Sequence, residues 1–436
     1  MKSKTTLSDM KKPYPYFTIL WLLISCSKSE DVPVNINTPT VSLEIIPTVT
    51  YQTITGFGGA NRMWGTMSLK PAEAQKAFGL GDNEMGMSMF RVRISSNKNE
   101  WPIIVEAVKE ANKRGVQVLA SPWSPPPALK DNNSDIRGIL LPENYTSFKN
   151  YINEFLAFIE KNGAKIDVVS IQNEPDWKPT YESCDWTAQE MINFLKAPGE
   201  IKGAKLAAPE SLNFNQAMTN AILNDEEAAK KIDIVAGHTY GAGTAKFPIA
   251  EQKKKEIWMT EYLLNLNTGN AGAAKWNTYS EAAKWDETIK MLTGIHDAMN
   301  VNWNAYIWWY LQRYYSFIGD GEEGTTFGEV LKRGYAYSHF SKFIRPGFVR
   351  IDTKSSSSFF LKTTAYKKDN QIVMVIINPD NFVVKNVQIQ GLAATNVTSY
   401  TTTEIVNIEK KSLNIVNKNV GFDMQPKSVT TLVINL

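Results

Sequence analysis

Cysteine and histidine are scarce in this sequence. Among 436 residues there are 2 Cys and 3 His. Cys26 lies in an N-terminal segment that differs from the rest of the chain, which leaves Cys184, and a single thiol cannot form an intrachain disulfide. The histidines, His238, His296 and His339, do not show the spacing of metal ligands. We therefore expect neither a disulfide framework nor a metal site.

The chain also lacks a strong excess of charge and a phosphate-binding motif. Its formal net charge is +3 and its Lys and Arg residues are scattered, whereas a nucleic-acid binder presents a basic face. The glycine-rich stretch "GFGGANRMWG" (56–65) lacks the Lys and Ser/Thr of a phosphate loop. These absences predict no nucleic-acid partner and no cofactor. Aromatic residues, by contrast, are plentiful, and the 12 Trp favour a flat apolar ligand such as a sugar ring.

The N-terminus has the composition of an export signal. Residues 1–25 contain Lys11 and Lys12 followed by the apolar run "PYPYFTILWLLIS", which is too short to span a bilayer. The run ends in "LISC" (23–26), which resembles the bacterial lipobox, and this resemblance implies lipidation of Cys26. Residues 26–39 are polar and aperiodic, as in a flexible linker. We expect an exported protein held by a lipid anchor on the cell envelope, at the outer membrane or cell surface; the alternative is a plain secretory signal.

The central part of the chain alternates short apolar runs with amphipathic segments. Runs buried on both faces and separated by helical patterns, such as 101–115 and 145–163, indicate parallel βαβ units. Eight such units match a (β/α)8 TIM barrel, which we place at residues 55–345. The eight expected strands are 55–60, 87–94, 116–123, 166–174, 204–210, 232–240, 256–261 and 304–311.

The two ends of the chain share a different pattern. Residues 346–436 alternate with a period of two and are rich in Val, Ile and Thr, with turn signals such as "NPDN" between the runs. Residues 40–54 have the same texture. We therefore predict an antiparallel β-sandwich side domain built from 346–436 and the strand segment 40–54.

Two glutamates end predicted barrel strands. Glu174 closes the fourth run in "SIQNEPDW", and Glu261 closes the seventh in "WMTEY". Because active sites of such barrels lie at the carboxyl ends of the strands, the two carboxylates should face each other across the barrel mouth. One then protonates a leaving glycosidic oxygen while the other attacks the anomeric carbon. Asn173, beside Glu174, is placed to hydrogen-bond a sugar hydroxyl.

Several motifs resemble those of glycoside hydrolase family 30. They are "GFGGA", "SPWSPP", "IQNEP", "WMTE", "YIWWY", "SVTTLVI" and, most specifically, "SHFSKFIRPGFVRID". The likeness extends from about residue 50 to 436 and is strongest to the bacterial glucuronoxylanase subfamily. It implies a retaining enzyme in which Glu174 is the acid/base and Glu261 the nucleophile.

The resemblance assigns further roles around the two glutamates. Arg91 matches the arginine that orients the nucleophile, with an internal salt bridge as the alternative. Trp123 matches the aromatic floor of the cleft, with simple core packing as the alternative. Tyr240 matches a hydroxyl that supports the nucleophile. His238 is either part of the site or a core histidine, and the sequence leaves both open.

The last predicted barrel strand carries three consecutive aromatic residues. Successive side chains on a strand point to opposite faces. We therefore assign Trp308 and Tyr310, which share a face, to the cleft and leave Trp309 as packing.

The sequence departs from the glucuronate-binding members at three positions. Those members have two consecutive arginines after the "WWY" segment, where this chain has Gln312 and Arg313, and a tyrosine and a serine where this chain has Leu263 and Leu266. We assign Gln312 to substrate binding and infer that the pocket for the acidic branch is lost or reshaped. A register shift that places Arg313 in the pocket is the alternative.

The resulting expectation is a monomeric endo-β-1,4-xylanase that acts on xylan without depending on glucuronate side groups. Two alternatives stay open. One is another β-glycosidase of the same family: a glucuronoxylanase, β-1,6-glucanase or glucosidase. The other is a non-catalytic lipoprotein that binds glycans at the surface.

Overall fold

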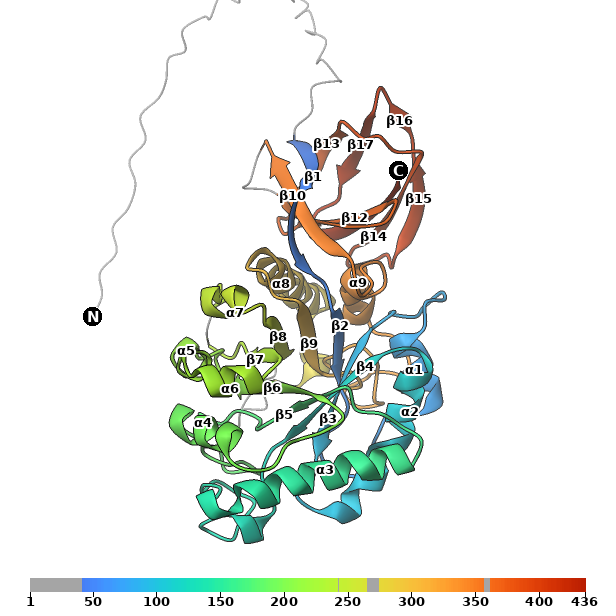
Figure 1. Cartoon of the computed structure of the whole chain (residues 1–436). Coiled ribbons are helices and arrows are strands. Elements are labelled where there is room, and N and C mark those ends of the chain that lie inside the picture. Colours follow the sequence, from blue (N-terminus) through green and yellow to red (C-terminus); the bar gives the residue numbers. More distant parts are fainter. Residues whose placement is uncertain (1–40, 242, 265–273, 357–360) are drawn as a thin grey trace, which may run out of the picture. The chain divides into compact units, whose positions relative to one another are not determined.

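The computed structural model describes residues 41–241, 243–264, 274–356 and 361–436. It comprises a closed eight-stranded barrel ringed by helices and a ten-stranded sheet (Figure 1). The predictions for residues 1–25 and 26–39, including Cys26, and the prediction for Leu266 lie outside these ranges. Within them, no helix is both long and apolar enough to cross a lipid bilayer.

The predicted barrel is confirmed, with all eight strands in the expected order. Each strand pairs in parallel with its neighbours, and β9 closes the ring against β2. The strands are β2 (Gly56–Ala60), β3 (Met89–Ile94), β4 (Gln117–Pro122), β5 (Val168–Ser170), β6 (Lys205–Ser211), β7 (Ile234–His238), β8 (Glu256–Glu261) and β9 (Ala305–Tyr310).

Both faces of these strands are buried, which explains their continuous apolar sequence. One face packs against the surrounding helices, and the other fills the barrel interior with a separate apolar cluster. The members of this interior cluster are Met89, Leu119, Val168, Ala207, Ile234, Ala236, Trp258, Ala305 and Ile307.

The helices begin and end where local sequence signals place them. Thr187 and Glu190 form a capping box at the start of α4, and the Ser280 hydroxyl accepts from a backbone N–H at the start of α8. The helices are α1 (Pro71–Phe78), α2 (Val105–Lys113), α3 (Tyr145–Lys161), α4 (Ala188–Lys196), α5 (Gln216–Asn224), α6 (Glu226–Lys231), α7 (Pro248–Gln252), α8 (Glu281–Asn300) and α9 (Lys332–Ser341).

The carboxyl-terminal rim of the barrel departs from regular strand pairing. The register shifts by one residue between β6 and β7, between β7 and β8, and between β2 and β9. The extra residues are Glu210, Thr260 and Trp309. Such bulges re-aim side chains beside active sites, and here they occur on the strands that carry the predicted site.

The β domain contains the expected N-terminal strand. β1 pairs antiparallel with β10 and parallel with β13, so the sheet is mostly rather than wholly antiparallel. The sheet order is β15-β14-β18-β12-β11-β10-β1-β13-β17-β16. The strands are β1 (Val41–Thr53), β10 (Val349–Ser355), β11 (Lys362–Lys368), β12 (Gln371–Asn378), β13 (Val384–Gln390), β14 (Asn396–Thr402), β15 (Glu409–Leu413), β16 (Ile415–Val416), β17 (Asn419–Met424) and β18 (Ser428–Asn435).

Strand β12 shows how the sheet joins the barrel. Ile372, Met374 and Ile376 point into the apolar core of the β domain. The intervening Val373 and Val375 belong instead to the large cluster that surrounds the barrel. Strand β12 is therefore buried on both faces, and contacts of α8 and α9 with the sheet unite the two parts.

His339 on α9 is the polar centre of this junction. Its side chain is fully buried, with Nδ1 2.8 Å from the Thr431 hydroxyl and Nε2 2.8 Å from the Thr402 hydroxyl. Burial lowers its pKa to about 3. The neutral imidazole is thus the form that fits between α9 and the sheet.

We predict that acid weakens this junction. The pKa of an unfolded histidine is about 6.5, so the contribution of neutral His339 is complete above that pH and is lost as pH falls toward 3. Between pH 6.5 and 4.5 this loss is about 2 kcal/mol, because the slope reaches about 1.4 kcal/mol per pH unit only below the unfolded-state pKa. His339→Gln, which does not titrate, should lose about that much less stability over this interval in urea unfolding. Equal losses in the two proteins would contradict the prediction.

Candidate active site

Two acidic side chains and one histidine converge at the carboxyl-terminal rim. One carboxylate oxygen of Glu174, one of Glu261 and a ring nitrogen of His238 lie within 4.8 Å of one another. Glu174 follows β5, His238 ends β7 and Glu261 ends β8. The side chains predicted from strand endings therefore do meet across the barrel mouth, and the open question about His238 is resolved in favour of the site.

Glu174 occupies an unusual backbone conformation. Its φ is +47°, and the φ of Glu210 at the end of β6 is +59°. Left-handed backbone at a non-glycine residue costs about 1–3 kcal/mol and persists only where neighbours hold it. Here the Glu174 N–H donates to the Glu210 carbonyl at 3.0 Å, and the Asn173 N–H donates to the Pro122 carbonyl at 2.8 Å. These bonds fix the direction of the Glu174 side chain.

Arg91 on β3 connects the site beneath the two glutamates. Its guanidinium is fully buried and donates to Glu261 Oε2 at 2.6 Å and to Asn173 Oδ1 at 2.6 Å. It also lies 3.1 Å from Glu210 Oε1. Both interpretations of Arg91 therefore hold, because it orients Glu261 and forms an internal salt bridge. Since the Asn173 oxygen accepts from Arg91, its amide nitrogen is the group that can donate to a ligand.

The charges in this cluster depend on one another. Burial by itself would lower the pKa of His238, but the carboxylates of Glu261, Glu174 and Glu210 raise it to about 9. Burial opposes the charge of Glu210, yet Arg91 and His238 hold its pKa at about 2. Burial raises the pKa of Glu261, although His238 and Arg91 act against this. The surrounding carboxylates therefore favour the charged form of His238 at neutral pH.

Tyr240 adds a second hydrogen bond to Glu261. Its hydroxyl donates to Glu261 Oε1 at 2.9 Å, while Arg91 binds Oε2. Each oxygen of Glu261 thus has a fixed donor. The side chain can neither rotate nor move away without breaking a charge-assisted hydrogen bond.

Aromatic side chains form one wall beside the glutamates. Trp309 and Tyr310 are partly exposed and stack with ring centroids 4.2 Å apart. Both pack against the small cluster of Ala60, Met63 and Trp123. Trp123 is 2% exposed and lies under the Arg91 guanidinium, 4.7 Å from it. Trp64 continues the wall, 5.5 Å from Trp123 and 6.4 Å from Trp309.

One aromatic assignment is wrong. Trp308, predicted to line the cleft, is fully buried in the cluster around the barrel and packs against Phe317 and Tyr262. Trp309, predicted to be packing, instead forms part of the aromatic wall together with Tyr310. Ala305 and Ile307 face the barrel interior while Tyr306 and Trp308 face outward, so regular alternation turns Trp309 inward and the prediction chose the wrong face. The bulge at Trp309 then brings Tyr310 to the same side as Trp309.

The segment after β9 turns its polar side chains inward. Gln312 is buried and donates from Nε2 to the Gly319 carbonyl at 3.3 Å. Arg313 lies 2.8 Å from Asp320 and 2.6 Å from Glu322. Leu263 is half-buried against the large apolar cluster. In this structure Gln312 therefore holds its own loop rather than facing the cleft, which corrects its assignment to substrate binding.

Three residues that contribute to the site were not predicted from the sequence. Glu210 obeys the same rule as Glu174 and Glu261, because it is a carboxylate at the end of a barrel strand, and that signal would have found it. Trp64 and Tyr181 lie on loops after β2 and β5, are 37% and 45% exposed, and pack with ring centroids 6.1 Å apart. No periodic pattern marks loop residues of this kind.

Glu174, His238 and Glu261 are also close enough to suggest a metal site, and no other such group occurs in the described part of the chain. The carboxylates around His238 raise its pKa, so a proton competes with a metal ion for this histidine. Arg91 already supplies a positive charge to Glu261. We therefore assign the cluster to acid–base chemistry.

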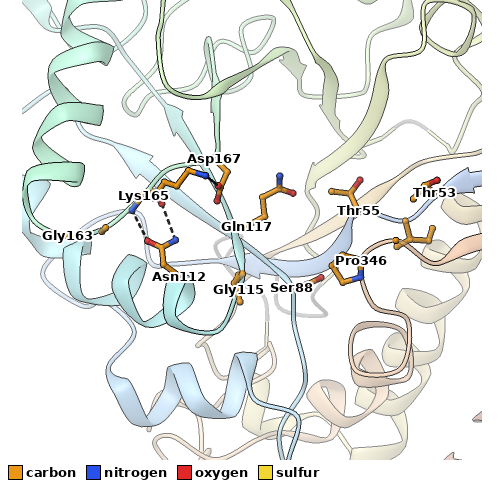
Figure 2. A pocket seen from close by; sticks show the side chains of 14 residues that line it. Thr53, Thr55, Ser88, Asn112, Gly115, Gln117, Gly163, Lys165, Asp167 and Pro346 are labelled. Atoms are coloured by element: carbon orange, nitrogen blue, oxygen red, sulfur yellow. Dashed lines mark hydrogen bonds and ion pairs between the residues drawn. The ribbon is translucent and has the colours of Figure 1, made fainter. Parts of the chain in front are cut away.

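A cavity of about 810 Å³ lies at the opposite end of the barrel. Figure 2 shows side chains that line it, among them Thr55, Ser88 and Gln117 at the amino ends of β2, β3 and β4. Its polar groups largely satisfy one another, since Lys165 pairs with Asp167 at 2.7 Å and Asn112 bonds the Lys165 backbone. Active sites of such barrels lie at the carboxyl-terminal face, so this cavity is separate from the chemistry.

Comparisons with known proteins agree with this geometry. A family model described as the glycosyl hydrolase family 30 TIM-barrel domain matches residues 74–313. Glucuronoxylanase XynC of Bacillus subtilis (strain 168) is 34% identical over 431 residues, covering 96% of each chain. The family 30 subfamily 8 xylanase Xyn30A of Clostridium acetobutylicum gives a TM-score of 0.79 at 30% identity, covering 91% of this chain and 99% of that one. An endoxylanase of Clostridium papyrosolvens C71 gives 0.76 at 29% identity, covering 91% and 100%.

We predict that Arg91 holds the site together electrostatically. Arg91→Met leaves Glu210 and Glu261 buried without their shared cation and should cost about 3–5 kcal/mol in denaturant unfolding. Adding Glu210→Gln removes one of the two stranded charges and should restore part of this loss, in a double-mutant cycle with a coupling of about 1–3 kcal/mol. If the two substitutions were simply additive, the shared-cation description would be incorrect.

Proposed function

This chain is a glycoside hydrolase that belongs to glycosyl hydrolase family 30, and from that membership we propose that it is a retaining endo-β-1,4-xylanase. The observation that carries the proposal is the separation of the acidic side chains. Retaining enzymes need carboxyl groups about 5–5.5 Å apart, whereas inverting enzymes leave about 6.5–9.5 Å for a water molecule. One oxygen of Glu174 and one of Glu261 lie within 4.8 Å of each other, which favours the closer spacing of retaining enzymes.

In the first step Glu261 attacks the anomeric carbon of the sugar. Arg91 and Tyr240 each bind one of its oxygens, so the carboxylate is held in place before the substrate arrives. This preorganisation avoids reorientation during the reaction. Glu174 gives its proton to the glycosidic oxygen of the departing chain, and a covalent glycosyl-enzyme forms.

In the second step Glu174, now ionised, takes a proton from a water molecule that attacks the same carbon. The bond to Glu261 breaks, and the product keeps its original configuration. His238 Nδ1 lies 2.9 Å from Glu174 Oε1, where it can contact both the acid and the base form of Glu174. The same side chain can therefore serve both steps.

The substrate we propose is the xylan main chain. The relatives named above are called xylanases or glucuronoxylanase, and the wall of Trp64, Trp309 and Tyr310 offers flat rings to pyranose sugars. We further propose independence from glucuronate side groups. Gln312 is turned into its loop, and Arg313 is neutralised by Asp320 and Glu322, so neither presents a free positive charge to an acidic branch.

Product analysis tests this proposal. The enzyme should release xylooligosaccharides from unbranched xylan at a rate within about 10-fold of that on glucuronoxylan. An enzyme that made a charge-assisted contact with the acidic branch, worth about 1.5–3 kcal/mol, would favour glucuronoxylan by more than about 10-fold. Glu174→Gln and Glu261→Gln, which keep side-chain size, should abolish release from both polymers. Cleavage restricted to glucuronoxylan, at spacings set by its branches, would refute the independence claim. Products from a β-1,6-glucan, or from no β-glycan, would indicate the other family activities or a binding protein.

We also propose that the protein is exported and anchored through a lipid on Cys26. The support is the "LISC" sequence after a short apolar run. Cys26→Ala should move the protein from the membrane fraction to the soluble or secreted fraction and abolish incorporation of radiolabelled palmitate. Retention of the label in the variant would show that the anchor, if any, lies elsewhere.

A further inference from the structure

Glu210 is a third buried carboxylate in the site, and the reaction described above gives it no role. Its side chain has no exposure to solvent. Its Oε1 accepts from the Ser121 hydroxyl at 3.2 Å and lies 3.7 Å from His238 Nε2. The other ring nitrogen of His238 lies 2.9 Å from Glu174. His238 thus bridges Glu210 on β6 and Glu174 after β5.

Structural need alone does not explain Glu210. Arg91 is already paired with Glu261 at 2.6 Å, so Glu210 adds a second buried negative charge to one buried cation. Burying an ion costs several kcal/mol unless its partners compensate fully. Moreover Glu210 Oε2 and His238 Nε2 are both buried without a hydrogen-bond partner among the described residues. A further positive charge on His238 is what balances this arrangement.

We propose that Glu210 is a positioning residue that keeps His238 in its doubly protonated form and thereby directs the acid proton of Glu174 toward the substrate. The inference rests on the acid/base role proposed for Glu174. The groups facing His238 are Glu174, Glu210 and Glu261, with the Tyr240 ring at 6.1 Å. While Glu174 carries the acid proton, the carboxylates of Glu210 and Glu261 at 3.7 and 4.0 Å still favour the charged imidazole.

The direction of the proton follows from donor and acceptor roles. A doubly protonated His238 donates from Nδ1 to Glu174 Oε1, so the acid proton must reside on Oε2, the other oxygen. A neutral His238 with a bare Nδ1 would instead accept that proton from Oε1 and hold it away from the glycosidic oxygen. After proton transfer, the imidazolium stabilises the new Glu174 carboxylate until water returns a proton in the second step.

The first test observes His238 directly and does not depend on any substrate. The chain has three histidines, so NMR of isotopically labelled histidine, with His296→Gln and His339→Gln to assign the signals, resolves each one. In the wild type the His238 ring should remain an imidazolium to about pH 8, and in Glu210→Gln its titration should fall by at least about one pH unit. An unchanged titration would overturn the proposal.

The second test separates proton delivery from general damage. Phenyl β-xylobioside has a poor leaving group that needs an acid, whereas dinitrophenyl β-xylobioside does not. Glu210→Gln should lower kcat/KM about 100-fold on the first and less than about 5-fold on the second, because general acid catalysis contributes about 10²–10⁴-fold. Equal losses on both substrates would identify a merely structural role. If the wild type hydrolyses neither, the proposed function fails while the NMR result still decides the role of Glu210.

Glu287→Gln is a matched control, since Glu287 is also a buried glutamate paired with an arginine, Arg333, but does not contact His238. It should alter neither the His238 titration nor the ratio between the two substrates. Should Glu210→Gln fail to fold, Glu210→Asp draws the carboxylate back from Nε2. It should lower the His238 titration by a smaller amount, and no change in this variant would equally overturn the proposal.

Discussion

The buried guanidinium of Arg91 is the interaction on which the site depends. It bonds to Glu261, Asn173 and Glu210, three side chains from three different strand ends. A charge without solvent is stable only when surrounded by opposite charges at hydrogen-bond distance. The closed barrel provides this environment, because its interior is filled with apolar side chains below Arg91 and its rim carries the carboxylates above. The positive charge of Arg91 therefore offsets the repulsion between the buried carboxylates of Glu210 and Glu261.

Much of this architecture could be predicted because it follows from regular patterns. Strands buried on both faces give continuous apolar runs, and their number and spacing identified the barrel. The end of a parallel strand opens toward the site, so carboxylates at strand ends, Glu174 and Glu261, could be located without knowing any contact. The β-domain strand at 41–53 was recognisable from its period-two texture. Each of these inferences uses only the periodicity of the chain and the place of a residue at the end of an apolar run.

The remaining features depend on contacts that no local pattern encodes. The bulges at Glu210, Thr260 and Trp309 come from the fit between neighbouring strands, so alternation alone could not place Tyr310 on the same side as Trp309. The inward turn of Gln312 depends on the Gly319 carbonyl that follows in the loop. The role of His238 depends on Glu174 and Glu210, which are 64 and 28 residues away in sequence (238 − 174 and 238 − 210). Only the folded chain brings such groups together.

The extra residue in β9 has an implication for how the cleft diverged. In a regular strand, neighbouring side chains face opposite ways, so no exchange of one amino acid for another can place two adjacent rings on the same surface. One additional residue achieves this, and Trp309 and Tyr310 stack as a continuous platform. Insertions and deletions at barrel rims, rather than point substitutions, are thus the evolutionary events that would add or remove whole sugar-stacking surfaces in enzymes of this architecture.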